Sequence, residues 1–124
     1  MTMIGHLSFG VRDLPRAKAF YTAVLAPLGY VELWGTDSGV GFGQPGKGDG
    51  FALFFRPGTT PPGPGFHLAF NAPDRAGVDE FYSAAISLGA SDSGPPGIRS
   101  HYSPTYYAAF VIDPEGYKIE AVHQ

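Results

Sequence analysis

The sequence contains no cysteine, which excludes disulfide bonds, thiolate metal sites and a cysteine nucleophile. It also has no basic stripe. Its 8 Lys and Arg and its 11 Asp and Glu are scattered, and the formal net charge is −3, which argues against nucleic acid as a partner. No apolar run is long enough to span a bilayer, and the N-terminus does not have the pattern of a signal peptide. These absences predict a cytoplasmic protein without membrane partners.

Glycine and proline are abundant, with 18 and 12 residues, but they cluster between periodic segments. Aromatic residues make up 15% of the chain, far more than a disordered chain carries. The composition therefore predicts short, aromatic-rich elements joined by tight turns. A length of 124 residues fits one domain with a real core, so we expect a single domain over residues 1–124.

Hydrophobic periodicity predicts the same order of elements twice. Residues 4–11 alternate as a strand, a helix begins after Asp13, and three strands follow at about 30–35, 38–44 and 50–56. After a Pro/Gly-rich stretch the order resumes, with a strand at 66–72 and a helix capped by Asp74. Later strands are expected near 90–92 or 98–102, at 106–112 and at 117–123, with residues 93–97 in a loop. Module one therefore spans about 1–57, the linker about 58–65 and module two about 66–124.

The two modules are an internal repeat. A shift of 61 residues (67 − 6) aligns His6 with His67, Asp13 with Asp74 and the pair Phe20-Tyr21 with Phe81-Tyr82. Each half reads βαβββ, and one such sheet alone would leave its inner face open to water. The sequence therefore predicts an α+β fold in which two βαβββ modules form a curved mixed sheet, an incomplete barrel, around a cleft.

Three side chains are candidate metal ligands. His6 and His67 hold equivalent positions in the first strands of the two modules, and a pseudo-twofold axis would bring their imidazoles together. Glu120 lies in the last strand, where an inward carboxylate needs a partner or a metal. Two histidines and one carboxylate at an open site suit Fe, Zn, Mn, Ni or Co. The alternative is that Glu120 lies on a solvated face beside Lys118.

The repeat, the paired histidines and the ending YYAAFVIDPEGYKIEAVH resemble the vicinal-oxygen-chelate superfamily of glyoxalases, bleomycin resistance proteins and extradiol dioxygenases. In that superfamily a histidine of the first strand, a histidine of the fifth and a glutamate of the eighth bind metal, which implies His6, His67 and Glu120. The fourth strand lacks the Glu or Gln that glyoxalase I uses there, so lactoylglutathione lyase activity is not implied. Phe110 stands where extradiol dioxygenases carry a tyrosine.

The resemblance implies a homodimer that binds a divalent metal ion and a small substrate with vicinal oxygens. The reaction would be isomerisation, lyase chemistry or ring-cleaving dioxygenation. The alternative is a metal-free small-molecule binding or drug-sequestering protein of the bleomycin-resistance type. His101 is the candidate general acid or base and Tyr107 a second catalytic candidate. Other residues expected in the cleft are Tyr102 and Tyr106, and either Arg56 or Arg99 for a substrate carboxylate, unless these arginines are solvated.

Overall fold

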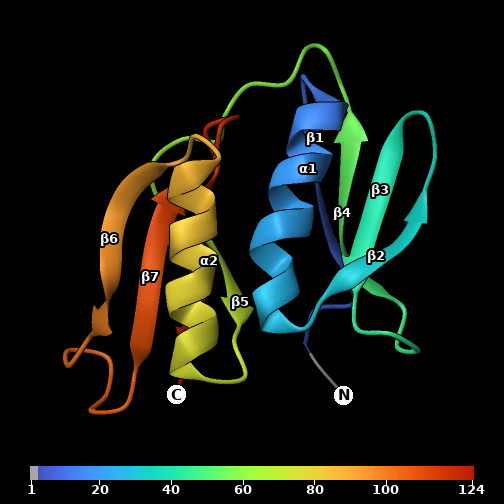
Figure 1. The fold of residues 1–124 in the computed structure, drawn as a ribbon. Coiled ribbons are helices and arrows are strands. Elements are labelled where there is room, and N and C mark those ends of the chain that lie inside the picture. Colours follow the sequence, from blue (N-terminus) through green and yellow to red (C-terminus); the bar gives the residue numbers. More distant parts are fainter. Residues whose placement is uncertain (1–2) are drawn as a thin grey trace.

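The protein is built from two four-stranded sheets and two α-helices (Figure 1). The structure is a computed structural model that describes residues 3–124, except for the side chain of Asp49. Residues 1 and 2, which the sequence assigned to module one, lie outside the described residues. In chain order the elements are β1 (Leu7–Val11), α1 (Leu14–Leu25), the 3-10 helix η1 (Ala26–Leu28), β2 (Val31–Gly35), β3 (Gly39–Gly43), β4 (Asp49–Phe55), β5 (Leu68–Asn71), α2 (Arg75–Ser87), β6 (Ser91–Ile98), β7 (Tyr107–Ile112) and β8 (Lys118–His123).

The predicted βαβββ repeat and the α+β class are confirmed. Sheet one has the strand order β1-β4-β3-β2 and sheet two the equivalent order β5-β8-β7-β6. In each sheet one parallel pair, β1 with β4 or β5 with β8, sits beside antiparallel pairs, so both sheets are mixed. The sheets do not close into a barrel. No helix in residues 3–124 is long and apolar enough to cross a membrane.

Both helices begin at an aspartate in equivalent positions of the repeat. The Asp13 side chain accepts a hydrogen bond from the backbone N–H of Arg16, and the Asp74 side chain accepts one from Gly77. Each bond satisfies an amide that has no partner within the helix. The chain leaves η1 through Gly29, whose φ of 88° lies in the left-handed region that favours glycine. The repeated sequence therefore gives both helices the same type of N-terminal cap.

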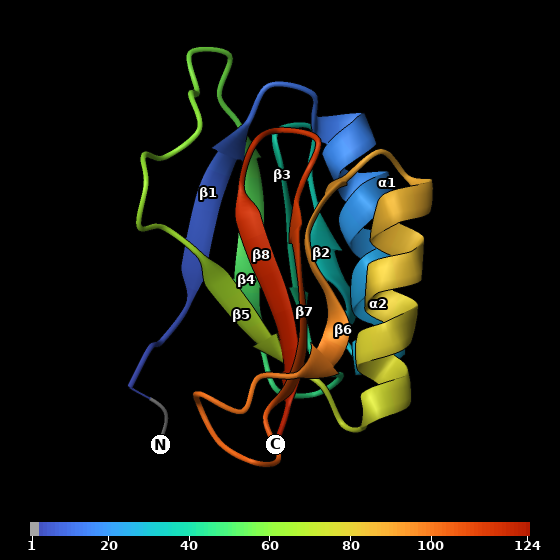
Figure 2. The same cartoon turned by 90° about the vertical axis from the view of Figure 1, so that its left-hand side faces the viewer.

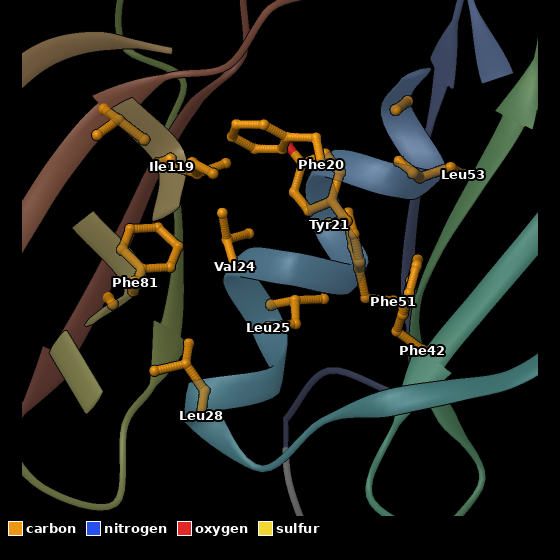
Figure 3. Close-up of a cluster of buried hydrophobic side chains, with 14 of the residues drawn as sticks. Phe20, Tyr21, Val24, Leu25, Leu28, Phe42, Phe51, Leu53, Phe81 and Ile119 are labelled. Atoms are coloured by element: carbon orange, nitrogen blue, oxygen red, sulfur yellow. The ribbon is translucent and has the colours of Figure 1, made fainter. Parts of the chain in front are cut away.

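One core spans both modules. Helices α1 and α2 lie side by side between the two sheets (Figure 1), and both are on the same side of the molecule (Figure 2). Figure 3 shows α1 in the middle of this core, with Phe81 and Ile119 of module two on one side and Phe51 and Leu53 of module one on the other. Each sheet therefore buries one face against the helices. Its other face, the outer face, points away from them.

Strand β6 differs from the prediction. The sequence placed residues 93–97 in a loop, whereas the structure includes them in β6. The strand tolerates Pro95 and Pro96 because it is the edge strand of sheet two and its pairing with β7 shifts register twice, around Gly94. Prolines and bulges interrupt the alternation of apolar and polar residues from which a strand is predicted.

The turn before β8 fastens module two to module one. The Glu115 carboxylate accepts hydrogen bonds from the backbone N–H groups of Arg12 and Asp13, at 2.9–3.0 Å, and pairs with the Arg12 side chain at 3.0 Å. Two residues earlier, Asp113 Oδ1 accepts from its own turn, while Oδ2 accepts from the buried Tyr21 hydroxyl of α1. We call Asp113 and Glu115 with these partners the inter-module clasp.

The clasp predicts an acid-sensitive contribution to stability. Burial acts to raise the pKa of Glu115, but the hydrogen bonds from Arg12 and Asp13 outweigh burial and lower this pKa below its ordinary value of 4.5. A lowered pKa in the folded state gives a stabilisation that is complete above the unfolded-state pKa and is lost as the pH falls through the folded-state pKa. We expect Glu115→Gln to cost about 2 kcal/mol at neutral pH and less at about pH 3.5.

Urea unfolding of wild type and variant at both pH values measures this difference. The titration of Asp113 changes the stability of wild type and variant by similar amounts, so it largely cancels in the difference between them. Glu80→Gln, which changes an exposed carboxylate of α2, is the matched control and should change stability at neither pH. A cost for Glu115→Gln that stays constant with pH would contradict the assignment.

Candidate functional site

The candidate site is built on the outer face of sheet two. The pairing register puts Ala69 of β5 and Phe110 of β7 on either side of Glu120 of β8. The residues flanking Glu120 in the strand, Ile119 and Ala121, both belong to the core. Because side chains alternate along a strand, Glu120 lies on the opposite face. The alternation noted in the sequence therefore placed Glu120 on the correct face.

Glu120 is not solvated, although it lies on an outer face. It has no exposed surface, and the Tyr106 hydroxyl donates a hydrogen bond to its Oε2 at 2.5 Å. Its Oε1 accepts no hydrogen bond from any of the described residues. Nε2 of His67 nevertheless lies 3.1 Å from Oε1, and the His67 side chain is 44% exposed. A buried carboxylate oxygen without a hydrogen bond destabilises the folded protein unless another group binds to it.

Tyr106 is held in its donor form. Burial, together with the hydrogen bond to Glu120 and the charge of that carboxylate, raises the pKa of Tyr106 well above its ordinary value. The phenol therefore stays protonated at neutral pH and donates to the Glu120 carboxyl group. It fixes one oxygen of the carboxylate and leaves the other beside His67.

This pair fits the chemistry of a divalent metal ion. An imidazole nitrogen and a carboxylate oxygen are ligands that Zn and related ions accept. Two such ligands, each about 2.1 Å from an ion and separated by roughly 90–110°, lie about 3.0–3.4 Å apart. The 3.1 Å between His67 Nε2 and Glu120 Oε1 falls in this range. The hydrogen bond from Tyr106 is of the kind that orients a ligating carboxylate.

The third expected ligand does not join them within one chain. His6 lies one residue before β1 and is exposed. Across residues 3–124 no group of three His, Asp or Glu side chains could hold a metal ion. The reason is the arrangement of the modules: the helices pack between the two sheets, and the outer face of each sheet points away from them (Figure 1). His67 and Glu120 are brought together and His6 is not.

A pocket of about 280 Å³ adjoins His67 on the same face. His101 and Tyr102 line it from the connection between β6 and β7, and their rings lie 4.2 Å apart, centroid to centroid. Arg99, Phe110 and Lys118 also line it. The sequence predicts His101, Tyr102 and either Arg56 or Arg99 in the cleft, whereas Lys118 marks only the alternative of a solvated face. Strand alternation alone already put Lys118 beside Glu120.

Tyr107 lies on the other side of the sheet. Its hydroxyl donates to Asp79 of α2 at 2.6 Å, and the Arg75 guanidinium lies 4.9 Å from its ring centroid. The tyrosine that reaches Glu120 is thus Tyr106, its neighbour. Adjacent residues of a strand point to opposite faces, and the sequence Tyr106-Tyr107 does not reveal which of the two faces the site.

Comparisons with known proteins agree with this fold. The profile of the Glyoxalase/Bleomycin resistance protein/Dioxygenase superfamily matches residues 3–121. The crystal structure of a glyoxalase/bleomycin resistance protein from Albidiferax ferrireducens T118 has 32% sequence identity, covers 99% of both chains and superposes with a TM-score of 0.84. No curated protein matches the chain.

Two more distant structures share the fold at 19% identity. One is the fosfomycin resistance protein FosX from Mesorhizobium loti, with a TM-score of 0.69 and coverage of 100% of this chain and 93% of that one. The other is a bleomycin resistance determinant encoded on the transposon Tn5, with a TM-score of 0.66 and coverage of 99% and 98%. The chain belongs to the glyoxalase/bleomycin resistance protein/dioxygenase superfamily.

Proposed function

We propose that this protein is a homodimer that binds a divalent metal ion and a small substrate with two adjacent oxygens. His67 and Glu120 of one copy supply two ligands, and His6 of the second copy supplies the third. The observation that carries the proposal is the buried Glu120 Oε1, which lacks a hydrogen bond yet lies 3.1 Å from His67 Nε2. When bound, the ion supplies a Lewis acid for the two substrate oxygens.

A second copy is the natural source of His6. Most homodimers are twofold symmetric, so a patch of one copy that meets a different patch of its partner does so twice. Packing the outer face of sheet one against the outer face of sheet two of the partner creates two identical clefts. The outer face of sheet one suits this role because it is apolar: the Trp34 ring lies against Gly41, where a Cβ would meet Nε1 at 2.0 Å, and near Phe54 with centroids 5.9 Å apart.

Each residue of the site has its own task. Tyr106 orients the Glu120 carboxylate through its hydrogen bond. His101 lines the same pocket as His67 and is the candidate general acid or base. Tyr107, the other catalytic candidate from the sequence, has its hydroxyl on Asp79. The proposal therefore gives Tyr107 no role in this pocket.

One observation favours a second candidate, a metal-free binding protein. The 3.1 Å between His67 and Glu120 is also an ion-pair distance, and an ion pair with a protonated imidazole needs no metal. The cleft between two copies would then bind a small molecule through its aromatic wall alone.

Metal analysis together with sedimentation separates these candidates. Chelator-treated protein is dialysed against Zn, Mn, Co, Ni or Fe(II), and bound metal is counted. One ion per chain in a dimer supports the proposal. A monomer, or a dimer that takes up no metal, contradicts it, and small-molecule binding by such a metal-free dimer identifies the second candidate.

The orienting role of Tyr106 gives a prediction of its own. Tyr106→Phe removes the hydrogen bond to Glu120 Oε2 and should lower metal affinity by about tenfold while preserving the fold. The matched control is Tyr107→Phe, which removes the neighbouring hydroxyl on the opposite face and should leave metal affinity unchanged. Competition with a chelating dye measures both variants. Equal effects of the two substitutions would refute the role given to Tyr106.

A further inference from the structure

The pocket beside His67 concentrates positive charge in an acidic protein. The chain carries a net charge of −3, yet two of its eight Lys and Arg, Arg99 and Lys118, line this one pocket together with two of its four histidines. Both cations lie over the same ring, with Arg99 Cζ and Lys118 Nζ each 5.4 Å from the Phe110 centroid. Arg99 and Lys118 carry like charges and repel each other at this ring. An anion bound beside them would offset this repulsion.

Neither cation has a carboxylate partner in the described part of the chain. The ion pairs found there are Arg12 with Glu115, Lys18 with Glu32, and His67 with Glu120. The described residues that line the pocket include no Asp or Glu, and Tyr106 and His67 already engage the nearby Glu120. The charge of Arg99 and Lys118 is therefore available to a ligand.

Arg99 is also held in place. Its Nη1 donates to the Gly97 carbonyl at 2.9 Å and its Nη2 to the Pro95 carbonyl at 2.8 Å, so two bonds to the backbone of β6 fix the guanidinium. Gly94 permits this position, because a Cβ there would lie 2.9 Å from Nη2 and 3.2 Å from the Phe110 ring. A surface arginine without a role is usually a mobile, solvated chain. This one is oriented before any ligand arrives, which lowers the entropic cost of binding.

We propose that Arg99 and Lys118 bind a carboxylate group of the substrate, so that the substrate is a small acid that also carries two adjacent oxygens. The part of the inference that concerns the two adjacent oxygens rests on the proposed function, whereas the part that concerns the carboxylate does not. A guanidinium fork matches a planar carboxylate, and Lys118 adds a point charge beside it. His67 lines the same pocket, so the carboxylate and the two oxygens would be held side by side. The volume of about 280 Å³ restricts the site to a small molecule.

Calorimetry with matched probes tests the carboxylate site in chelator-treated protein, without any metal. Benzoate should bind at least about tenfold more tightly than its neutral isostere benzamide, and added salt should reduce this preference. Arg99→Gln and, independently, Lys118→Gln should each remove most of the preference. The matched control is Arg75→Gln, which changes an arginine that also stacks on an aromatic ring but lies on α2, and it should leave the preference intact. Equal binding of benzoate and benzamide, or a preference that survives both pocket substitutions, overturns the inference.

Two further arms separate this inference from the proposed function. In metal-loaded protein, 3,4-dihydroxybenzoate should bind at least about tenfold more tightly than catechol, and Lys118→Gln should weaken only the former. If no metal binds but benzoate is still preferred through Arg99 and Lys118, the proposed metal function fails and the carboxylate site stands. If metal and catechol bind but the carboxylate adds no affinity, the carboxylate site fails and the proposed metal function stands. Phenylphosphonate binding more tightly than benzoate would overturn the choice of a carboxylate.

Discussion

A mixed dimer of His6→Ala and His67→Ala chains is expected to bind one metal ion, although each variant alone binds none at the same concentration. Loss of one ligand in three should lower affinity by at least about a hundredfold, more than the loss of a residue that only orients a ligand. If each site draws His6 from the partner, the mixed dimer contains one cleft with both histidines intact and one with neither. A site formed within one chain would leave no intact cleft in any combination.

The two variants are co-expressed with different affinity tags, and the mixed dimer is isolated by two successive purification steps. Metal is then counted per dimer after dialysis. The control is His123→Ala, because the His123 ring lies 3.1 Å from the Ala72 carbonyl and takes no part in the site, so this variant should bind metal like wild type. A mixed dimer as empty as its parents would refute the shared site, while leaving open a site within one chain.

Asp113→Ala should be the most destabilising single substitution outside the apolar core, at about 4 kcal/mol. The substitution leaves the backbone N–H groups of Glu115 and Tyr117 and the hydroxyl of Tyr21 without their acceptor, and all of them are buried. Each unsatisfied buried donor costs about 1–3 kcal/mol, and some of this cost is recovered by relaxation and water. Chemical unfolding followed by circular dichroism measures the loss.

Two related variants test the cause of this loss. Tyr21→Phe removes only the hydroxyl and should cost about 1–2 kcal/mol. Combined with Asp113→Ala it should add almost nothing, since the bond between the two side chains is already broken. Additive losses would show that the hydroxyl is stabilised by something other than Asp113. Asp92→Ala, which removes an exposed carboxylate bonded to the Tyr82 hydroxyl, is the control and should cost far less.

The sequence predicts the fold well because the information is local and duplicated. Alternation at residues 4–11, the Asp13 and Asp74 caps and the alignment of His6 with His67 each report short-range geometry, and the repeat confirms one half with the other. Strand β6 was the exception, since prolines and bulges interrupt its alternation. The face of Glu120 also followed from alternation with Ile119 and Ala121.

The relative placement of the modules did not follow from the sequence. Both modules could surround one cleft within a chain or turn their outer faces apart, and the local patterns are identical in the two cases. The choice depends on which apolar faces meet, here the faces of α1 and α2, and on the clasp between Glu115 and Arg12. The hydrogen bond from Tyr106 to Glu120 was out of reach for a similar reason, because contacts across strands depend on register.

The order of strands in sheet two has a consequence for biosynthesis. The last strand of the chain, β8, is not at an edge but between β5 and β7, as Figure 2 shows. Until residues 118–123 have left the ribosome, β5 has no neighbour to pair with and the hairpin of β6 and β7 lacks its inner partner. Module two therefore completes its sheet only once β8 is available, and a nascent chain that stalls before Lys118 presents two unpaired strand edges to other chains.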